Sequence, residues 1–237
     1  QQYHLNQEQK ELLTSFIYRR QKKEPVAYIL GYKYFWQWKF IVNNHVLIPR
    51  PETEILVEQA IKLFTKQKKI KVLELGTGSG AIAISIAKER INWQITALDY
   101  SEIALKVAHA NAKKLQVNNI KFLKSDWFSS LKIENYDIII SNPPYIAVDD
   151  KNITDTELTF EPNLALYAGK DGLMSIKKIV AEVSKFMHND SIFLLEYGYQ
   201  QKMIIDEICI NYHLNLIANY RDFAQIPRVS AYKISLK

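Results

Sequence analysis

Four consecutive residues, Asn142-Pro143-Pro144-Tyr145, are the strongest candidates for chemistry in this sequence. They directly follow 136–141, an apolar run with the composition of a buried β-strand. Two successive prolines fix the backbone and remove two N–H donors, so that carbonyl acceptors remain. The side-chain oxygen of Asn142 and the carbonyl of Pro143 can then accept both hydrogens of a planar –NH2 group, with the Tyr145 ring beside them. The pattern therefore predicts a site that holds an amide or base amino group and aims its nitrogen.

Attack by that nitrogen on an activated methyl group is the reaction that such a clamp favours. Amide and exocyclic base nitrogens are weak nucleophiles, and fixed hydrogen-bond acceptors raise their electron density. Holding the nitrogen about 3–3.5 Å from the methyl makes the step effectively unimolecular. A sulfonium donor leaves as a neutral thioether, so no strong general base is required. The five histidines have no metal-ligand spacing, and we expect no metal site.

Three of only seven glycines, Gly76, Gly78 and Gly80, form a second cluster in Glu-Leu-Gly-Thr-Gly-Ser-Gly. The cluster follows an apolar run and precedes a helical pattern, where glycines let a ligand lie against the backbone and the first helical N–H groups are free to donate. Its spacing also fits the dinucleotide fingerprint through Ala81, so the glycines alone leave NAD and S-adenosylmethionine both open.

Two further strand ends carry residues suited to a nucleoside. Asp99 stands 23 residues after Gly76, where a carboxylate can accept both ribose hydroxyls. Its alternative role is to cap a helix that starts at Ser101. Asp126 can accept an adenine amino hydrogen and Trp127 can cover the ring, although Trp127 also suits a protein core. These residues predict a nucleoside pocket at one edge of a sheet.

The elements that must position these residues follow from hydrophobic periodicity. Uniformly apolar strands such as Asp-Ile-Ile-Ile predict a sheet covered on both faces, hence an α/β, doubly wound, seven-stranded mixed sheet of Rossmann-like type. We expect 146–171 to be a long functional loop. The predicted strands are 71–76, 94–99, 120–125, 136–141, 191–197, 214–220 and 229–235; the predicted helices are 52–66, 80–90, 101–115, 172–187 and 200–211.

The N-terminal part has a different character. A polar, basic helix is predicted over 7–23, and the aromatic stretch 28–46 predicts a β-hairpin with its turn at Asn43-Asn44. We therefore expect residues 1–23 to be the remnant of an N-terminal helical domain, 24–50 a hairpin connector and 51–237 the catalytic domain. A solvated basic linker is predicted at 66–71.

Composition limits the possible classes. A chain of 237 residues with 48% apolar and 24% charged residues is ordinary for a globular protein and excludes fibrous, disordered and disulfide-stapled classes. The net charge of +6 is weak evidence for a nucleic-acid partner. Cys209 is the only cysteine, so an intrachain disulfide is excluded, and no apolar run approaches a membrane span. We expect a cytoplasmic monomer that does not contact membranes.

The combined motifs resemble a known family. Glu-Leu-Gly-Thr-Gly-Ser-Gly followed by Asn-Pro-Pro-Tyr is similar to the class I S-adenosylmethionine-dependent amino-methyltransferases. From residue 24 to its end, the chain resembles the release factor glutamine methyltransferase family. The strings that narrow the resemblance are 24–31, Leu47-Ile48-Pro49-Arg50-Pro51-Glu52-Thr53-Glu54, Ser125-Asp126-Trp127-Phe128 and Phe160-Glu161-Pro162.

This resemblance implies methylation of the side-chain amide nitrogen, N5, of the glutamine in the Gly-Gly-Gln motif of class 1 peptide chain release factors. S-adenosylmethionine would be the donor and S-adenosylhomocysteine the product. Arg50 and Glu52 would shape the entrance or form a structural pair. The implied cofactor residues are Gly76, Thr77, Gly78, Ser79, Gly80, Asp99, Trp127 and Asn142. The implied substrate residues are Asn142, Pro143, Pro144 and Tyr145, of which Asn142, Pro143 and Tyr145 would be catalytic.

Several alternatives share part of this pattern. A nucleic-acid methyltransferase acting on adenine N6 or ribosomal RNA guanine N2 would use the same –NH2 clamp, but the Pro-Arg-Pro string and the lack of a separate target-recognition domain argue against it. An inactive cofactor-binding scaffold would not require the proline string. A NAD-dependent dehydrogenase would leave Asn142–Tyr145 unexplained. Family members also carry a small helical N-terminal domain, and some continue into a tRNA guanine-N7 methyltransferase domain.

Overall fold

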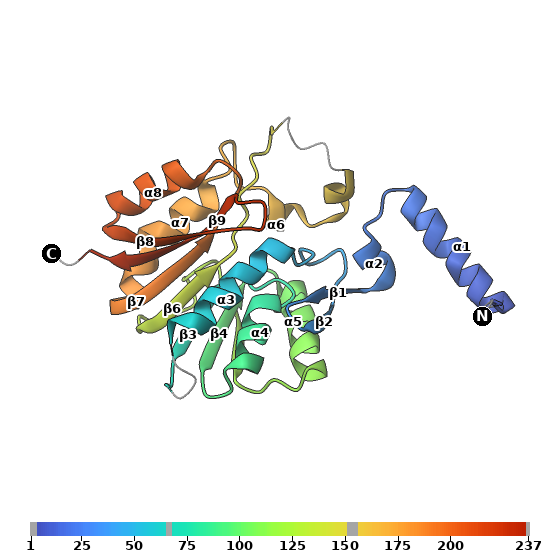
Figure 1. Cartoon of the computed structure of the whole chain (residues 1–237), viewed down its shortest axis with the longest axis horizontal. Coiled ribbons are helices and arrows are strands. Elements are labelled where there is room, and N and C mark those ends of the chain that lie inside the picture. The colour runs from blue at the N-terminus through green and yellow to red at the C-terminus, as the bar shows by residue number, and fades with distance from the viewer. Residues whose placement is uncertain (1–3, 65–67, 151–155, 236–237) are drawn as a thin grey trace.

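A seven-stranded sheet forms the centre of the molecule (Figure 1). The computed structural model describes residues 4–64, 68–150 and 156–235. The strand order is β5-β4-β3-β6-β7-β9-β8, in which β5 to β7 run parallel and β9 is antiparallel to both of its neighbours. The predicted seven-stranded mixed sheet is thus confirmed. Its strands are β3 (Lys71–Leu75), β4 (Gln94–Asp99), β5 (Ile120–Lys124), β6 (Tyr136–Ser141), β7 (Met187–Glu196), β8 (Leu214–Arg221) and β9 (Pro227–Ile234).

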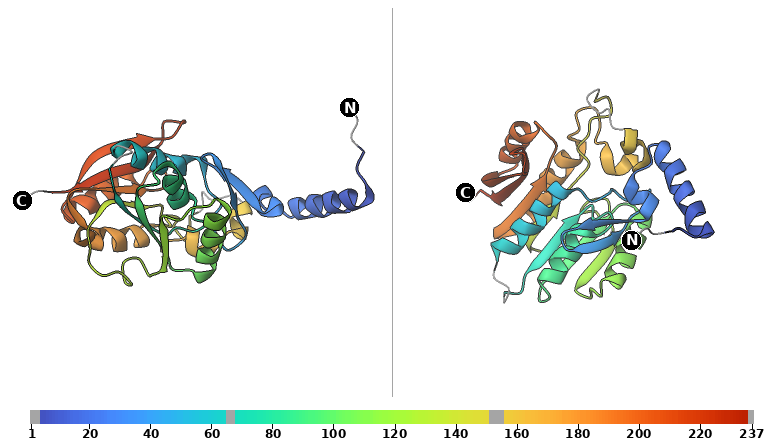
Figure 2. Two further views of the ribbon diagram at one scale, coloured as in Figure 1. Left: turned by 90° about the horizontal axis from the view of Figure 1, so that it is seen from below. Right: turned by 45° about the vertical axis from the view of Figure 1, so that its right-hand side comes forward.

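Helices cover both faces of this sheet (Figures 1 and 2). Alternate strand residues enter different cores: Val72 packs in the cluster that contains α3 and α4, whereas Leu73 packs in the cluster that contains α7 and α8. Because both side-chain directions are buried, the strands are apolar without alternation. The helices are α3 (Glu54–Leu63), α4 (Ala81–Glu89), α5 (Glu102–Lys114), α7 (Met174–Val183) and α8 (Lys202–Asn211).

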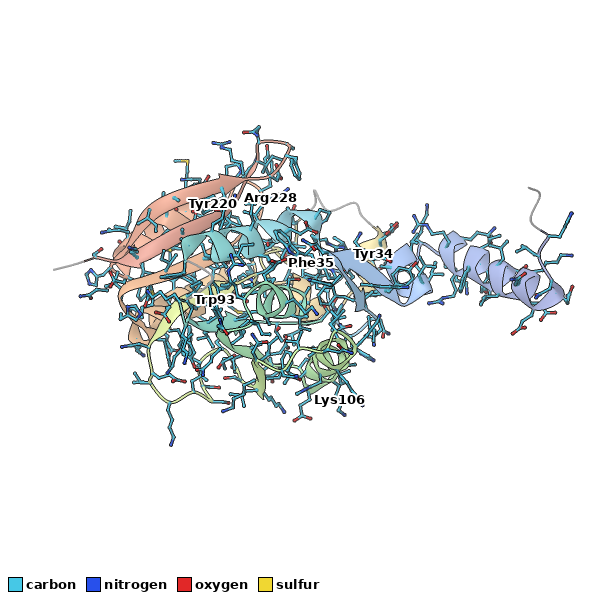
Figure 3. All side chains as sticks on the ribbon, turned by 60° about the horizontal axis from the view of Figure 1, so that its bottom comes forward. Tyr34, Phe35, Trp93, Lys106, Tyr220 and Arg228 are labelled. Atoms are coloured by element: carbon cyan, nitrogen blue, oxygen red, sulfur yellow. The ribbon has the colours of Figure 1, made fainter. Side chains whose placement is uncertain are left out.

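The N-terminal segment forms an arm and a hairpin. Helix α1 (Gln7–Gln21) extends away from the domain and has no buried residue, and it is followed by the short helix α2 (Val26–Leu30) (Figure 2). The hairpin of β1 (Tyr32–Phe35) and β2 (Trp38–Ile41) packs onto the domain through Phe35 and Phe40, which belong to the same core as α3 and α4; Phe35 is labelled in Figure 3.

The turn of this hairpin was wrongly predicted. It lies at Trp36-Gln37 rather than at Asn43-Asn44, and Trp36 has a φ of +54°. The cause is tertiary: the Trp36 backbone N–H donates to Glu54 Oε1 at 2.7 Å, and its indole Nε1 donates to Glu89 Oε1 at 3.0 Å. The side chain of Asn43 instead accepts the His45 N–H at 3.0 Å, which makes a separate local turn.

The boundaries of two predicted helices also differ from those in the structure. The helix predicted over 172–187 ends with α7 and the turn η3 (Ser184–Phe186), because Met187 already pairs with Tyr136 of β6. The helix predicted over 52–66 consists of η1 (Pro51–Thr53) and α3. Its last residues, and part of the predicted linker 66–71, lie outside the described residues, as do positions 151–155 of the predicted loop. The described part of that loop contains η2 (Thr156–Phe160) and α6 (Asn163–Leu166).

Candidate active site

A cavity of about 400 Å³ lies where β3, β4, β5 and β6 end. Its rim is formed by segments around Leu47 and Leu164, which are far apart in the sequence. The sequence-predicted site residues that line the cavity are Gly76, Gly78, Asp99, Trp127, Asn142 and Pro144. The structure therefore brings together residues from four strand ends, whereas Thr77, Ser79, Gly80, Pro143 and Tyr145 are not among the lining residues.

The glycine loop between β3 and α4 turns sharply at three positive φ angles, +76° at Gly76, +55° at Gly78 and +81° at Gly80. A Cβ on Gly80 would lie 2.8 Å from Ile84 Cδ1 and 3.2 Å from Ala108 Cβ, so this glycine lets the loop pack against α4 and α5. A Cβ on Gly78 would meet nothing within 4 Å. Gly78 thus combines a left-handed backbone with open space on the cavity wall, as a loop that cradles a ligand requires.

Asp99 connects this loop to the second strand. Its Oδ2 accepts the Gly78 N–H at 2.8 Å and its Oδ1 accepts the Ser101 N–H at 2.8 Å. The N-cap of α5 is Ser101 itself, whose hydroxyl accepts the Ala104 N–H. Burial raises the pKa of Asp99, and backbone hydrogen bonds act in the opposite direction. Each carboxylate oxygen has a second acceptor position, so contact with a ribose stays a prediction that this geometry permits.

Trp127 also lines the cavity, and its backbone has a φ of +49°. An ideal Cβ on Gly76 would lie 3.9 Å from its ring, and the ring also packs against the core that contains α7 and α8. A left-handed backbone costs a bulky residue about 1–2 kcal/mol. Such strain is commonly retained where a side chain serves a site. The sequence left open whether Trp127 belongs to the nucleoside pocket or to the protein core. In the structure its side chain contacts both.

Several distant segments of the chain contact the Asn142–Tyr145 string. Asn142 Nδ2 donates to Thr53 Oγ1 at 3.1 Å, and the Tyr145 carbonyl accepts Gln201 Nε2 at 2.9 Å. A Cβ on Gly172 would lie 2.4 Å from that same carbonyl, so only glycine permits this approach. The Tyr145 side chain packs against the core that contains α7 and α8, and burial raises its pKa.

Two buried carboxyl groups were not foreseen from the sequence. Glu74 on β3 accepts the Thr77 hydroxyl at 2.5 Å, and burial raises its pKa to about 7. Glu196 at the end of β7 accepts the Thr53 hydroxyl at 3.1 Å, and burial raises its pKa to about 8. An acidic residue within an otherwise apolar strand, as in Leu-Leu-Glu, is the signal that would have found them.

Arg50 has a different partner from the one proposed from the sequence. It pairs with Glu161 of the Phe160-Glu161-Pro162 string rather than with Glu52. The other Glu161 oxygen accepts the Ile48 N–H at 2.9 Å. A single buried carboxylate thus joins the two strings on either side of the cavity rim.

Comparison with known proteins identifies the family. Residues 66–224 match the family model described as a methyltransferase domain. The release factor glutamine methyltransferase of Coxiella burnetii is 43% identical over 95% of this chain and 80% of its own length, and that of Shewanella oneidensis is 40% identical over 94% and 78%. The chain belongs to the release factor glutamine methyltransferase family.

The fold of this family member agrees with solved structures. A methyltransferase from Pyrococcus furiosus superposes with a TM-score of 0.64 at 16% identity, over 94% of this chain and 98% of that one. At that identity, the likeness shows a class I methyltransferase fold alone.

The cavity fits the methyl donor of a class I methyltransferase. It offers an open glycine backbone at Gly78, a carboxylate at Asp99 and an indole face at Trp127, which match the polar, ribose and ring parts of S-adenosylmethionine. Within residues 4–64, 68–150 and 156–235, no group of three or more His, Cys, Asp or Glu side chains is arranged to hold a metal ion. No helix of those same ranges is long and apolar enough to cross a membrane.

The buried carboxyl of Glu196 predicts a pH-dependent stability. Its ordinary pKa of 4.5 is raised to about 8 in the folded protein. The unfolded chain ionises first as the pH rises, so the stabilising contribution is present below pH 4.5 and is lost as the pH approaches 8. Urea unfolding should show that Glu196→Gln gains about 1–3 kcal/mol relative to the wild type between pH 5.5 and 8. Glu182→Gln, at an exposed residue that pairs with Lys185, is the control. Equal pH dependence of the Glu196→Gln and wild-type proteins would contradict a protonated Glu196.

Proposed function

We propose that this chain transfers a methyl group from S-adenosylmethionine to the N5 amide nitrogen of the glutamine in the Gly-Gly-Gln motif of class 1 release factors. The observation that carries this proposal is the orientation of Asn142. Its Nδ2 donates to Thr53, so the other amide atom of this cavity-lining residue, Oδ1, is an acceptor with no donor among the described residues. Family membership supports an amide acceptor, and the relatives known as release factor glutamine methyltransferases support release factors as substrates.

In the proposed mechanism, each part of the site has a defined task. Residues Gly76 to Gly80, Asp99 and Trp127 bind and orient the donor, which supplies an electrophilic methyl group when bound. Asn142 Oδ1 and the Pro143 carbonyl accept the two hydrogens of the glutamine amide, so the nitrogen lone pair is aimed at the methyl. The Pro144 surface and the Tyr145 segment hold the glutamine side chain in place. The nitrogen becomes acidic as the new C–N bond forms, and its extra proton is released to water.

We also propose the boundaries in the chain. Residues 51–237 form the methyltransferase domain, 24–50 a connecting hairpin and 1–23 part of a helical domain. The hairpin is a connector in sequence but shares the domain core through Phe35 and Phe40. The proposed reaction takes place in the cytoplasm and is carried out by a monomer.

Transfer of labelled methyl groups to three acceptors tests the substrate. We expect label on a class 1 release factor, none on its variant with the motif glutamine changed to alanine, and none on total RNA or DNA. Label on nucleic acid and not on the release factor would overturn the proposal in favour of an exocyclic-amine methyltransferase. Label on both release-factor forms would place methylation at another residue.

Asn142→Ala should abolish methyl transfer while the affinity for S-adenosylmethionine stays within about tenfold. The reason is that its main proposed contact is with the acceptor amide, and removing one preorganised group from a reacting centre costs about 10²–10³ in rate. Single-turnover transfer and calorimetric titration of the donor measure the two effects. A large loss of donor affinity would show that this division of roles is wrong.

Asp99→Ala should have the opposite order of effects. Loss of a charge-assisted hydrogen bond weakens donor binding by about 1.5–3 kcal/mol. The same carboxylate also orders the glycine loop through the Gly78 N–H, which reinforces the loss. Calorimetric titration measures it, with Asp190→Ala as the control, since Asp190 is exposed and does not line the cavity. Unchanged affinity in Asp99→Ala would restrict Asp99 to a structural role.

A further inference from the structure

A chain of hydrogen bonds runs behind the proposed acceptor site. Asn142 Nδ2 lies 3.1 Å from Thr53 Oγ1, and Thr53 Oγ1 lies 3.1 Å from Glu196 Oε1. The three residues follow β6, end η1 and end β7, so the chain crosses elements that are distant in sequence. Thr53 and Glu196 are almost fully buried, and neither lines the cavity.

The donor and acceptor roles in this chain follow from the direction of the bond in which the Thr53 hydroxyl donates to Glu196 Oε1. A threonine hydroxyl has a single hydrogen, and the contact with Glu196 uses it. The hydroxyl can then only accept from Asn142, so Asn142 must present Nδ2. Rotating the amide by half a turn would direct Oδ1 at a hydroxyl with no hydrogen left to donate. A buried polar group without a partner is destabilising.

Glu196 accepts the Thr53 hydrogen through Oε1. Within the part of the chain that the structure describes, its second oxygen, Oε2, is buried without a hydrogen-bond partner. The neighbouring charge of Glu52 raises the pKa of Glu196, whereas Arg228 and the hydroxyls of Thr53 and Tyr145 lower it. A neutral carboxyl with its proton on Oε2 keeps Oε1 as an acceptor for Thr53, as does an ionised carboxylate.

The segment that carries Thr53 is itself held in place. Its backbone N–H donates to the Arg50 carbonyl at 3.1 Å, Pro51 fixes the start of η1, and the Arg50 side chain pairs with Glu161. The Pro-Arg-Pro-Glu-Thr string thus supplies a rigid turn that delivers one hydroxyl to the back of Asn142.

We propose that Thr53 and Glu196 are positioning residues that hold the Asn142 amide in the orientation in which Oδ1 faces the acceptor nitrogen. This inference rests on the proposed function, because it assigns the free Oδ1 to a glutamine amide. Neither residue contacts the reacting atoms. The effect of Thr53 on the rate passes through Asn142, which separates this role from a general contribution to stability, whereas Glu196 also interacts with the Tyr145 hydroxyl.

Two pairs of variants test the proposal by kinetics. Thr53→Val keeps the shape and removes the acceptor, and Glu196→Met removes the acceptor for the Thr53 hydrogen. We expect kcat to fall about 10- to 100-fold in each, on the scale of an unsatisfied buried hydrogen bond, while donor affinity stays within about threefold. Thr53→Ser and Glu196→Gln restore the acceptors and should recover kcat to within about fivefold of the wild type. Thr96→Val, at a partly buried threonine on β4, is the control for the loss of a hydroxyl.

Three kinetic outcomes would overturn the inference. The first is an unchanged kcat in Thr53→Val, and the second is a loss of kcat in Thr53→Ser as large as that in Thr53→Val. The third is a loss of kcat that correlates across the variants with donor affinity or melting temperature and not with the presence of a hydroxyl at position 53. A wild-type protein that does not methylate the release factor is a different result, because it refutes the proposed function and not the geometry.

Nuclear magnetic resonance of the protein with 15N-labelled asparagine distinguishes a failure of this inference from a failure of the proposed function. The Asn142 side-chain signal, assigned by its absence in Asn142→Ala, reports the amide without any substrate. We expect one of its Nδ2 hydrogens to be protected from exchange in the wild type and in Thr53→Ser, and to lose at least about tenfold protection in Thr53→Val. Equal exchange in all three proteins would overturn the locked orientation, whatever the acceptor of the enzyme is.

Discussion

The site depends on the parallel pairing of β3 with β6. In that register Leu75 lies opposite Ser141, so the glycine loop and the proline string leave neighbouring strands at the same level. The Ser141 hydroxyl donates to the Leu75 carbonyl at 3.0 Å, which fixes this level at the last pair. Strand β4 lies on the other side of β3, so the order of the sheet reverses here and the connections diverge to leave a crevice. A slip by one residue would displace the glycine loop, proposed to hold the donor, from the proline string, proposed to hold the acceptor.

Buried carboxyl groups connect the segments around that crevice. Glu74 reaches Thr77 of the glycine loop, Glu196 reaches Thr53 of η1, and Glu161 joins Arg50 and Ile48. Burying an acidic group costs free energy unless hydrogen bonds compensate for it, and one oxygen each of Glu74 and Glu196 has no partner among the described residues. Apolar residues at these positions would give a more stable core. They would not fix the loop, the turn and the rim relative to the strand ends.

The sequence pattern alone predicted the strands and the edge of the sheet that holds the cavity, because these features depend on residues close together in the chain. Apolar runs predicted all seven strands, most clearly the inner strands β3 and β6, whose two faces are both covered. The glycine and proline strings identified the edge that holds the cavity. The hairpin turn, the start of β7 and the partner of Arg50 were missed because each depends on a distant contact. Thr53 lies 89 residues from Asn142 and 143 from Glu196, so no spacing rule connects them. The sequence shows that these three residues are polar, but only the fold brings their side chains into contact.

The choice of acceptor lies outside the clamp. A glutamine amide and a base amino group both present a planar nitrogen with two hydrogens, so the acceptors proposed at Asn142 and Pro143 would bind both alike. Discrimination between a glutamine and a base therefore requires surfaces outside the site of the methyl donor. The residues at the rim of the cavity are candidates for these surfaces. One side is the segment His45–Leu47, and the other is formed by Pro162, Leu164 and Tyr167. The Arg50–Glu161 pair joins these sides at a buried carboxylate. A glutamine on a protein loop would reach the proposed acceptor site as a single narrow side chain, whereas a base must be swung out of a nucleic acid and would bring its sugar and phosphates against the same residues.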